Sequence, residues 1–138
     1  MSWAVPRLAA GPVAIATTAP PARVSALQAA FGQAVVAHRA EQVLSAIAQR
    51  LTGEAGVRRL LIAGGETAGA ILRALGVNTL RVGPYEGPGI SRVIAREADP
   101  IALVLKSGKL GPVDMFARVL EDMKRPIERP ANLESWPP

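Results

Sequence analysis

The stretch from Leu60 to Gly76, LLIAGGETAGAILRALG, constrains the fold more than any other part of the sequence. It opens with four consecutive apolar residues, which is typical of a strand buried on both faces. Two glycines follow at once, and adjacent glycines allow a sharp turn that brings the backbone close to a ligand. The apolar spacing after the turn predicts a helix over residues 67–75, with Thr67 as its N-cap and Gly76 just beyond its end.

A glycine turn that leads into a helix can bind an anion, because free N–H groups and the helix dipole both point at the turn. The stretch lacks the GxxxxGK[ST] pattern of a P-loop and the GxGxxG pattern of a dinucleotide-binding fold. Spacing by itself therefore leaves two interpretations open. The turn either binds phosphate or is a tight connection between strand and helix that binds nothing.

A second stretch repeats this design between residues 101 and 123. The run IALVL predicts a central strand over Ile101–Leu105, and a Lys-Ser-Gly turn follows it directly. A helix is predicted over residues 112–123, because Pro112 suits the first helical position and Asp114 suits the positive end of the dipole. The chain thus contains two apolar strands that each end in a glycine-containing turn and a helix.

The two turns would face one crevice if their strands are neighbours, because ligands bind beyond the carboxyl ends of the strands in an open α/β sheet. Lys106 and Lys109 would supply positive charge there, and Thr67 and Ser107 would supply hydroxyl groups, a combination suited to phosphate. The alternative for Lys106 is a solvated charge at a strand end. Glu66 would contact a ribose or a metal-bound water, or would accept a backbone N–H in its own turn.

The remaining segments complete an α/β pattern. We expect a single α/β domain over residues 12–123, with a mostly parallel or mixed central sheet covered by helices. The other predicted elements are an irregular lead-in over 1–11, a strand over Pro12–Thr17, helices over 22–31 and 34–51, a strand over Thr79–Val82, a loop over 83–89, a short edge strand over Ile90–Glu97 and an irregular proline-rich tail over 124–138.

The composition limits the chemistry of the chain. There is no cysteine and only one histidine, His38, so a disulfide, a thiolate metal site and a multi-histidine metal site are excluded. The net charge is +5, but the sixteen basic residues are spread along the chain among acidic ones, which favours a solvated surface over a nucleic-acid interface. Prolines and glycines interrupt the apolar N-terminal region, so no signal peptide or membrane span is predicted, and we expect a cytoplasmic protein.

The segments LLIAGGETAGAILRALGVNTLRVGP, PGISR and PIALVLKSGKLGPVDMFARVLE resemble the C-terminal nucleotide-binding domain of the four-carbon acid sugar kinases, over about Pro12 to Glu121. These enzymes phosphorylate tetronate-type acids such as 3-oxo-tetronates, erythronate and threonate. In that family the first turn reads GGETSG, the second resembles KSGNFG, and both contact ATP. The resemblance implies ATP and Mg²⁺ as cofactors. It implies a nucleotide-binding site made of Gly64, Gly65, Glu66, Thr67, Lys106, Ser107 and Gly108.

The sequence departs from the family pattern by substitutions in the two turns and by the absence of segments that the family contains. Ala68 stands where the family usually has Ser, and Lys109 and Leu110 replace an Asn-Phe pair. The substrate domain that would hold the sugar acid and the catalytic base precedes the nucleotide domain in the family, and neither it nor a GSxS-type opening turn is present in residues 1–11. The resemblance therefore implies a partial kinase with undetermined catalytic residues, which works as a homo-oligomer or with a separate substrate-domain subunit.

Three functions remain open on the sequence alone. The first is the ATP-binding portion of a sugar-acid kinase, which is inactive by itself. The second is a non-catalytic binding or assembly domain that kept the kinase scaffold. The third, which the scattered charges disfavour, is a basic nucleic-acid-binding module.

Overall fold

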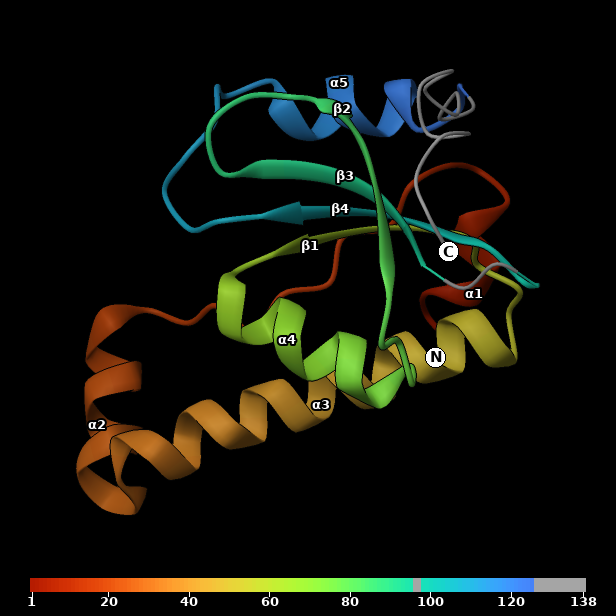
Figure 1. The fold of residues 1–138 in the computed structure, drawn as a ribbon. Coiled ribbons are helices and arrows are strands. Elements are labelled where there is room, and N and C mark those ends of the chain that lie inside the picture. Colours follow the sequence, from red (N-terminus) through yellow and green to blue (C-terminus); the bar gives the residue numbers. More distant parts are fainter. Residues whose placement is uncertain (96–97, 126–138) are drawn as a thin grey trace.

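The computed structural model describes residues 1–95 and 98–125 of the chain. The elements in chain order are α1 (Val5–Leu8), α2 (Pro21–Phe31), α3 (Gln33–Gly53), β1 (Arg59–Ala63), α4 (Gly65–Ala74), β2 (Leu80–Tyr85), β3 (Ile90–Ala95), β4 (Ile101–Lys106) and α5 (Met115–Asp122). They form three layers, with α3 and α4 on one face of the sheet and α5 on the other (Figure 1). The predicted α/β class with a helix-covered sheet is confirmed.

The sheet is mixed, and its strand order is β1-β4-β3-β2. Strands β1 and β4 are parallel and in register from the Arg59–Ala102 pair to the Ala63–Lys106 pair. The β4–β3 and β3–β2 pairs are antiparallel. The two strands that precede the glycine turns are therefore direct neighbours, and their carboxyl ends lie at the same edge of the sheet.

The predicted strand over Pro12–Thr17 is wrong, because residues 12–20 have no regular secondary structure. The run PVAIAT favours extended backbone, but a strand also needs a partner for its N–H and C=O groups, and sequence propensity does not supply one. Within the lead-in over residues 1–11, Val5–Leu8 forms a single helical turn. The predicted irregular tail lies outside the described residues from residue 126 onward.

The second half of the sheet also differs from the sequence prediction. The predicted edge strand over Ile90–Glu97 is an inner strand, since β3 lies between β2 and β4; residue 97 itself lies outside the described residues. The predicted loop over 83–89 begins later, because β2 continues through Tyr85. Pro84 is tolerated there because β2 is an edge strand with an irregular register between Val82 and Tyr85, where a missing N–H breaks few ladder bonds.

The predicted helices over 22–31 and 34–51 are confirmed as α2 and α3. Helix α2 has no buried residue and extends away from the sheet beside the start of α3 (Figure 1). The buried part of α3 is its C-terminal half, where Ala48 and Leu51 pack, whereas Val43 nearer its middle is half exposed. Within the described residues, no helix is both long and apolar enough to cross a membrane.

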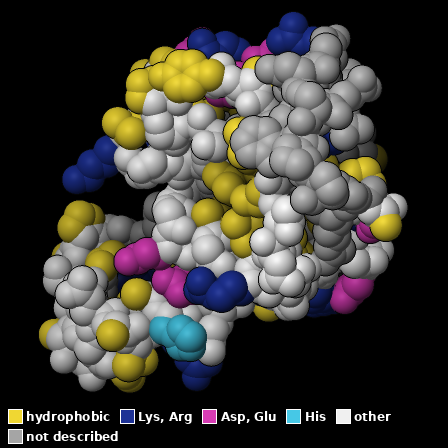
Figure 2. Space-filling view, in the orientation of Figure 1, with side chains coloured by type: hydrophobic (Ala, Val, Ile, Leu, Met, Phe, Trp, Pro, Cys, Tyr) yellow, Lys and Arg dark blue, Asp and Glu magenta, His cyan; other side chains and the backbone are white. Residues whose placement is uncertain are grey.

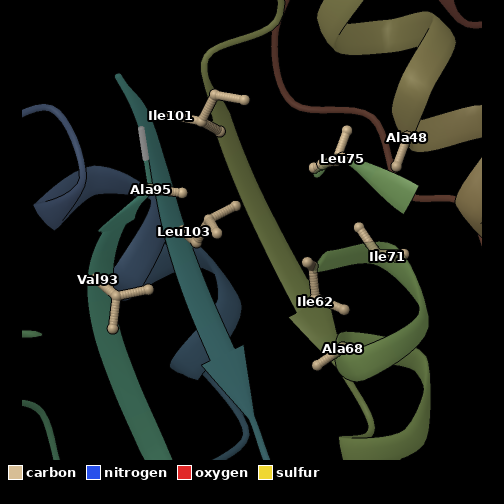
Figure 3. Close-up of a cluster of buried hydrophobic side chains, with 9 residues drawn as sticks. All are labelled: Ala48, Ile62, Ala68, Ile71, Leu75, Val93, Ala95, Ile101 and Leu103. Atoms are coloured by element: carbon tan, nitrogen blue, oxygen red, sulfur yellow. The ribbon is translucent and has the colours of Figure 1, made fainter. Parts of the chain in front are cut away.

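Two hydrophobic clusters hold the sheet between its helices. The larger cluster joins β1, β3 and β4 to α3 and α4 (Figure 3), and its buried members are Ala48, Ile62, Ala68, Ile71, Leu75, Val93, Ala95, Ile101 and Leu103. The smaller cluster joins Ile90 and Val104 to α5 through Met115, Val119 and Met123. Because alternate residues of β4 enter the two clusters, this strand is buried on both faces, as its apolar run predicted.

Replacement of Leu103 by Ala tests this core. Leu103 is completely buried in the larger cluster, so we expect Leu103→Ala to lower the free energy of unfolding by about 2–5 kcal/mol. Urea unfolding monitored by circular dichroism measures the loss. Val113→Ala, which truncates an exposed side chain, is the control and should change the free energy by less than about 0.5 kcal/mol. Equal losses in the two variants would contradict the described core.

Candidate functional site

The structure brings the two glycine turns together at the carboxyl edge of β1 and β4. The N–H of Gly64, the first residue after β1, donates to the carbonyl oxygen of Lys106, the last residue of β4, at 2.8 Å. This bond extends the parallel ladder by one step and fixes the spacing between the two turns. The sequence expectation depended on these strands being neighbours, and the pairing supplies that condition.

The first turn leaves the first amides of α4 without a partner inside the helix. Gly64 has φ 112° and ψ 126°, a conformation that residues with a Cβ atom rarely adopt, and α4 begins at the next residue. The first hydrogen bond within the helix runs from the N–H of Ala68 to the carbonyl of Gly64, at 2.9 Å. The amides of residues 65–67 precede that bond, and helix geometry gives them no partner within the helix.

The predicted N-cap role of Thr67 is wrong, because α4 begins two residues earlier and Gly64 occupies the cap position. Thr67 lies in the first turn instead, and its Oγ1 would be 3.3 Å from a Cβ atom at Gly64. Gly65 and Glu66 are exposed, and no atom lies within 4 Å of the place where a Cβ at Gly65 would stand. The predicted end of the helix is confirmed, since Gly76 has φ 68° and follows the C-cap Leu75.

The second turn is exposed from Ser107 to Lys109. The ammonium group of Lys106 donates to the carbonyl oxygen of Ser107 at 2.8 Å, so this charge lies close to the backbone of its own turn. Lys109 has φ 61°, in the left-handed region that favours glycine and asparagine. The predicted helix over 112–123 begins at Met115, with Asp114 at its N-cap position.

A third turn lies at the same edge, within the segment over residues 83–89 that the sequence predicts only as a loop. It joins β2 to β3 through residues 86–89, and Gly89 accepts the N–H of Ser107 at 2.8 Å. Glu86 in this turn pairs with Arg92 of β3. The signal in the sequence was the Gly-Pro-Gly triplet at residues 87–89, which predicts a turn but not its contact with another one.

The residues at which this chain departs from the family motif lie in different surroundings. Ala68 is 7% exposed and packs in the larger cluster, so the methyl group at this position faces the core and not the turn surface. Leu110 is half exposed, and its Cδ1 would be 2.5 Å from a Cβ at Gly89. Lys109 is exposed beside it.

Other polar features lie away from the turns. His38 is exposed on α3, where its Nε2 is 3.0 Å from Nε2 of Gln42. The hydrogen bond from Arg50 lowers the pKa of Glu54 below its usual range, and this exposed pair is at the C-terminal end of α3. A cavity of about 280 Å³ lies at the opposite edge of the sheet; it is lined by Gln49, Thr52, Gly53, Arg58, Ala74, Leu75 and Asp99. In the described part of the chain, no group of three or more acidic or histidine side chains could hold a metal ion.

Sequence comparison matches residues 1–116 to the family described as "Nucleotide-binding C-terminal domain". The chain is 46% identical over 124 residues to a 3-oxo-tetronate kinase of Methylobacterium radiotolerans, which covers 89% of this chain and 29% of that protein. It is 42% identical over 112 residues to a 3-oxo-tetronate kinase of Cupriavidus necator, which covers 81% of this chain and 26% of that protein. The chain therefore spans little more than a quarter of the length of these relatives.

Two solved structures share the fold. One, from Salmonella typhimurium LT2 and described as a tRNA synthase, superposes with a TM-score of 0.67 at 36% identity, over 77% of this chain and 25% of that one. The other, a Haemophilus influenzae protein, superposes with a TM-score of 0.66 at 33% identity, over 75% of this chain and 25% of that one. A 3-oxo-tetronate kinase of Salmonella typhimurium is also 36% identical to this chain, over 110 residues.

The left-handed backbone at Lys109 leads to a stability prediction. We expect Lys109→Asn, which restores the residue type of the family motif, to raise the free energy of unfolding by about 1 kcal/mol, because asparagine tolerates this conformation better. Urea unfolding measures the gain. Lys109→Ala removes the same charge but keeps an unfavourable side chain at φ 61°, so it should give no gain. A gain in the Ala variant equal to that in the Asn variant would show that charge, and not backbone strain, is responsible.

Proposed function

We propose that this chain, which belongs to the family of nucleotide-binding C-terminal domains, binds ATP as the nucleotide-binding portion of a four-carbon acid sugar kinase. The observation that carries the proposal is the 2.8 Å hydrogen bond from Gly64 to Lys106, which holds two glycine turns at one edge of the sheet. The proposed nucleotide contacts are Gly64, Gly65, Glu66, Thr67, Lys106, Ser107 and Gly108.

The backbone of the first turn is suited to phosphate. The amides of residues 65–67 carry the partial positive charge of the α4 N-terminus, and the open space at Gly65 lets a phosphate oxygen approach them. The ammonium group of Lys106 is held beside the second turn by its bond to Ser107. Negative charge placed between the turns would thus meet backbone donors from one side and a cation from the other.

Mg²⁺ would accompany the nucleotide. Magnesium in kinases is held by one or two carboxylates together with substrate phosphates and water, and not by a cage of protein side chains. Glu66 is the exposed carboxylate in the first turn of α4, so the donor set of this chain fits a phosphate-bound ion. Mg²⁺ would neutralise phosphate charge during transfer, while the residues of the two turns hold the nucleotide in position.

The acceptor of the phosphoryl group is proposed from the relatives. Those relatives are 3-oxo-tetronate kinases, so the acceptor would be a hydroxyl of a four-carbon sugar acid. Since the chain spans about a quarter of their length, the acceptor site would lie in a part of the kinase outside these 138 residues. The proposed partners of the chain are a second copy of itself or a substrate-domain subunit. The proposal divides the chain into a lead-in over 1–11, a nucleotide-binding domain over 12–123 and a tail over 124–138. It also includes a cytoplasmic location.

Two alternatives make different predictions. A non-catalytic assembly domain would have the same fold without nucleotide binding. A nucleic-acid-binding module would need a continuous basic surface, but Lys and Arg side chains are separate on the face in Figure 2, with acidic side chains between several of them. Ion pairs also engage Arg50, Arg58, Arg92, Lys124 and Arg125. The charge distribution therefore supports the nucleotide proposal over the nucleic-acid one.

Gly65→Val tests the proposed site. A branched side chain at this position would occupy the space that phosphate oxygens need, and we expect it to abolish binding of Mg-ADP in calorimetric titration. No protein atom lies within 4 Å of a Cβ atom at Gly65, so the valine should lower the free energy of unfolding by only about 1 kcal/mol. The thermal unfolding midpoint should therefore fall by only a few degrees. Gly53→Val is the matched control, since Gly53 is also a helical glycine with open space but lies at the opposite edge. Equal affinity in both variants would place the nucleotide elsewhere.

The isolated 138-residue chain should not turn over substrate at a useful rate. Phosphoryl transfer depends on an acceptor hydroxyl held in line with the γ-phosphate, and such alignment contributes about 7–11 kcal/mol. The glycine turns and the side chains of Glu66, Lys106 and Lys109 would contact the nucleotide, but they provide no second domain that could bind the sugar acid. Incubation with Mg-ATP and a panel of tetronates and 3-oxo-tetronates, with ADP release as the readout, tests this. Turnover of about 1 per second or faster would contradict it.

A further inference from the structure

We infer that the turn between β2 and β3, residues 86–89, forms a third part of the nucleotide site, and that Gly89 and the Arg92–Glu86 pair are positioning residues for the Ser107 turn. This inference rests on the proposed function, since it assigns a role within the same site. The segment PGISR, residues 88–92, is part of the stretch that resembles the family, but the nucleotide contacts that the resemblance implies come only from the first and second turns.

A continuous series of backbone hydrogen bonds joins the three turns. The N–H of Gly64 donates to the carbonyl of Lys106, and the N–H of the next residue, Ser107, donates to the carbonyl of Gly89, each at 2.8 Å. The second turn is therefore held from both sides, by the first turn through Lys106 and by the third turn through Ser107. A displacement of Gly89 would move Ser107, which is a proposed nucleotide contact.

Gly89 has little room for any other residue. It has φ 68°, and a Cβ atom there would stand 3.1 Å from Cβ of Ser107 and 2.5 Å from Cδ1 of Leu110. The Leu110 methyl group can rotate away, but the Ser107 Cβ is attached directly to the backbone of the second turn. An added methyl group at Gly89 would therefore push that turn by a few tenths of an ångström.

A buried charged pair fixes the third turn to the sheet. The side chain of Arg92 is only 7% exposed and that of Glu86 17%, and Nη1 of Arg92 lies 3.5 Å from Oε1 of Glu86. Nη2 of Arg92 also donates to the backbone carbonyl of Arg125 at 2.6 Å, beyond the end of α5. A buried guanidinium must have its partners, so Arg92 holds Glu86, at the start of the turn, in one place relative to β3 and α5.

Gly89→Ala and Gly56→Ala form a matched pair of variants. Gly56 has φ 66°, nearly the same as Gly89, so alanine meets the same backbone strain at both positions. No atom lies within 4 Å of a Cβ at Gly56, which is in the turn before β1 at the opposite edge of the sheet. We expect Gly89→Ala to weaken binding of Mg-ADP by about tenfold or more and Gly56→Ala to leave it unchanged, in calorimetric titration of the whole chain.

Arg92→Lys tests the charged pair by a readout that general destabilisation would not mimic. Lysine keeps the charge but loses the fork that reaches Glu86 and the Arg125 carbonyl together. In the absence of nucleotide, we expect the amide hydrogen of Ser107 to exchange about tenfold faster, while that of Leu103 in the core keeps its wild-type rate. A uniform change at both amides would mean that Arg92 acts only on global stability.

The outcomes separate this inference from the proposed function. If the wild-type chain binds Mg-ADP and the two alanine variants bind equally well, the third turn does not position the site, and the nucleotide proposal stands. If the wild-type chain binds no nucleotide, the proposed function is wrong, and so is the role of the third turn in a nucleotide site. The exchange rate of Ser107 still decides, in that case, whether Arg92 holds the turn.

Discussion

The parallel pairing of β1 and β4 is the interaction on which the rest of the structure depends. It places the end of β1, an edge strand in which only Ile62 is buried although its apolar run predicted burial on both faces, beside the end of β4. The bond from Gly64 to Lys106 continues the pairing into the turns. Leu103 and Val104 are completely buried on opposite faces of β4, so the strand is fixed by packing from both sides. The proposed binding edge is therefore carried by rigid elements, which favours precise placement of backbone donors.

The parts of the fold that the sequence predicts are those set by local signals. Apolar runs mark β1 and β4, and glycines mark the turns that follow them. Strand pairing is not a local property, and for this reason the sequence predicts neither that residues 12–17 lie outside the sheet nor that β3 is an inner strand. Strand β3 also contains a charged residue, Arg92, whose guanidinium is buried against Glu86.

The start of α4 shows how a small error in a helix boundary changes the chemistry. A threonine cap at Thr67 would use its hydroxyl to bond the amides that follow it. The chain instead begins the helix at Gly65, after a glycine whose φ of 112° directs the chain into the helix without a side-chain cap. The amides at the start of α4 therefore receive no hydrogen bond from a side-chain cap, which suits the proposed phosphate site. Sequence preference predicted a capped helix, and the glycine conformation produces an uncapped one.

The departures from the family motif affect different parts of the site. Ala68 replaces a residue that faces the core, so the missing hydroxyl removes no group from the surface of the turn. Lys109 has a left-handed conformation, with φ 61°, that its side chain disfavours. Donation from backbone amides does not depend on side-chain identity. A site that binds phosphate through glycine turns can therefore tolerate these substitutions, whereas a change at Gly64 or Gly89 alters the backbone that forms the site.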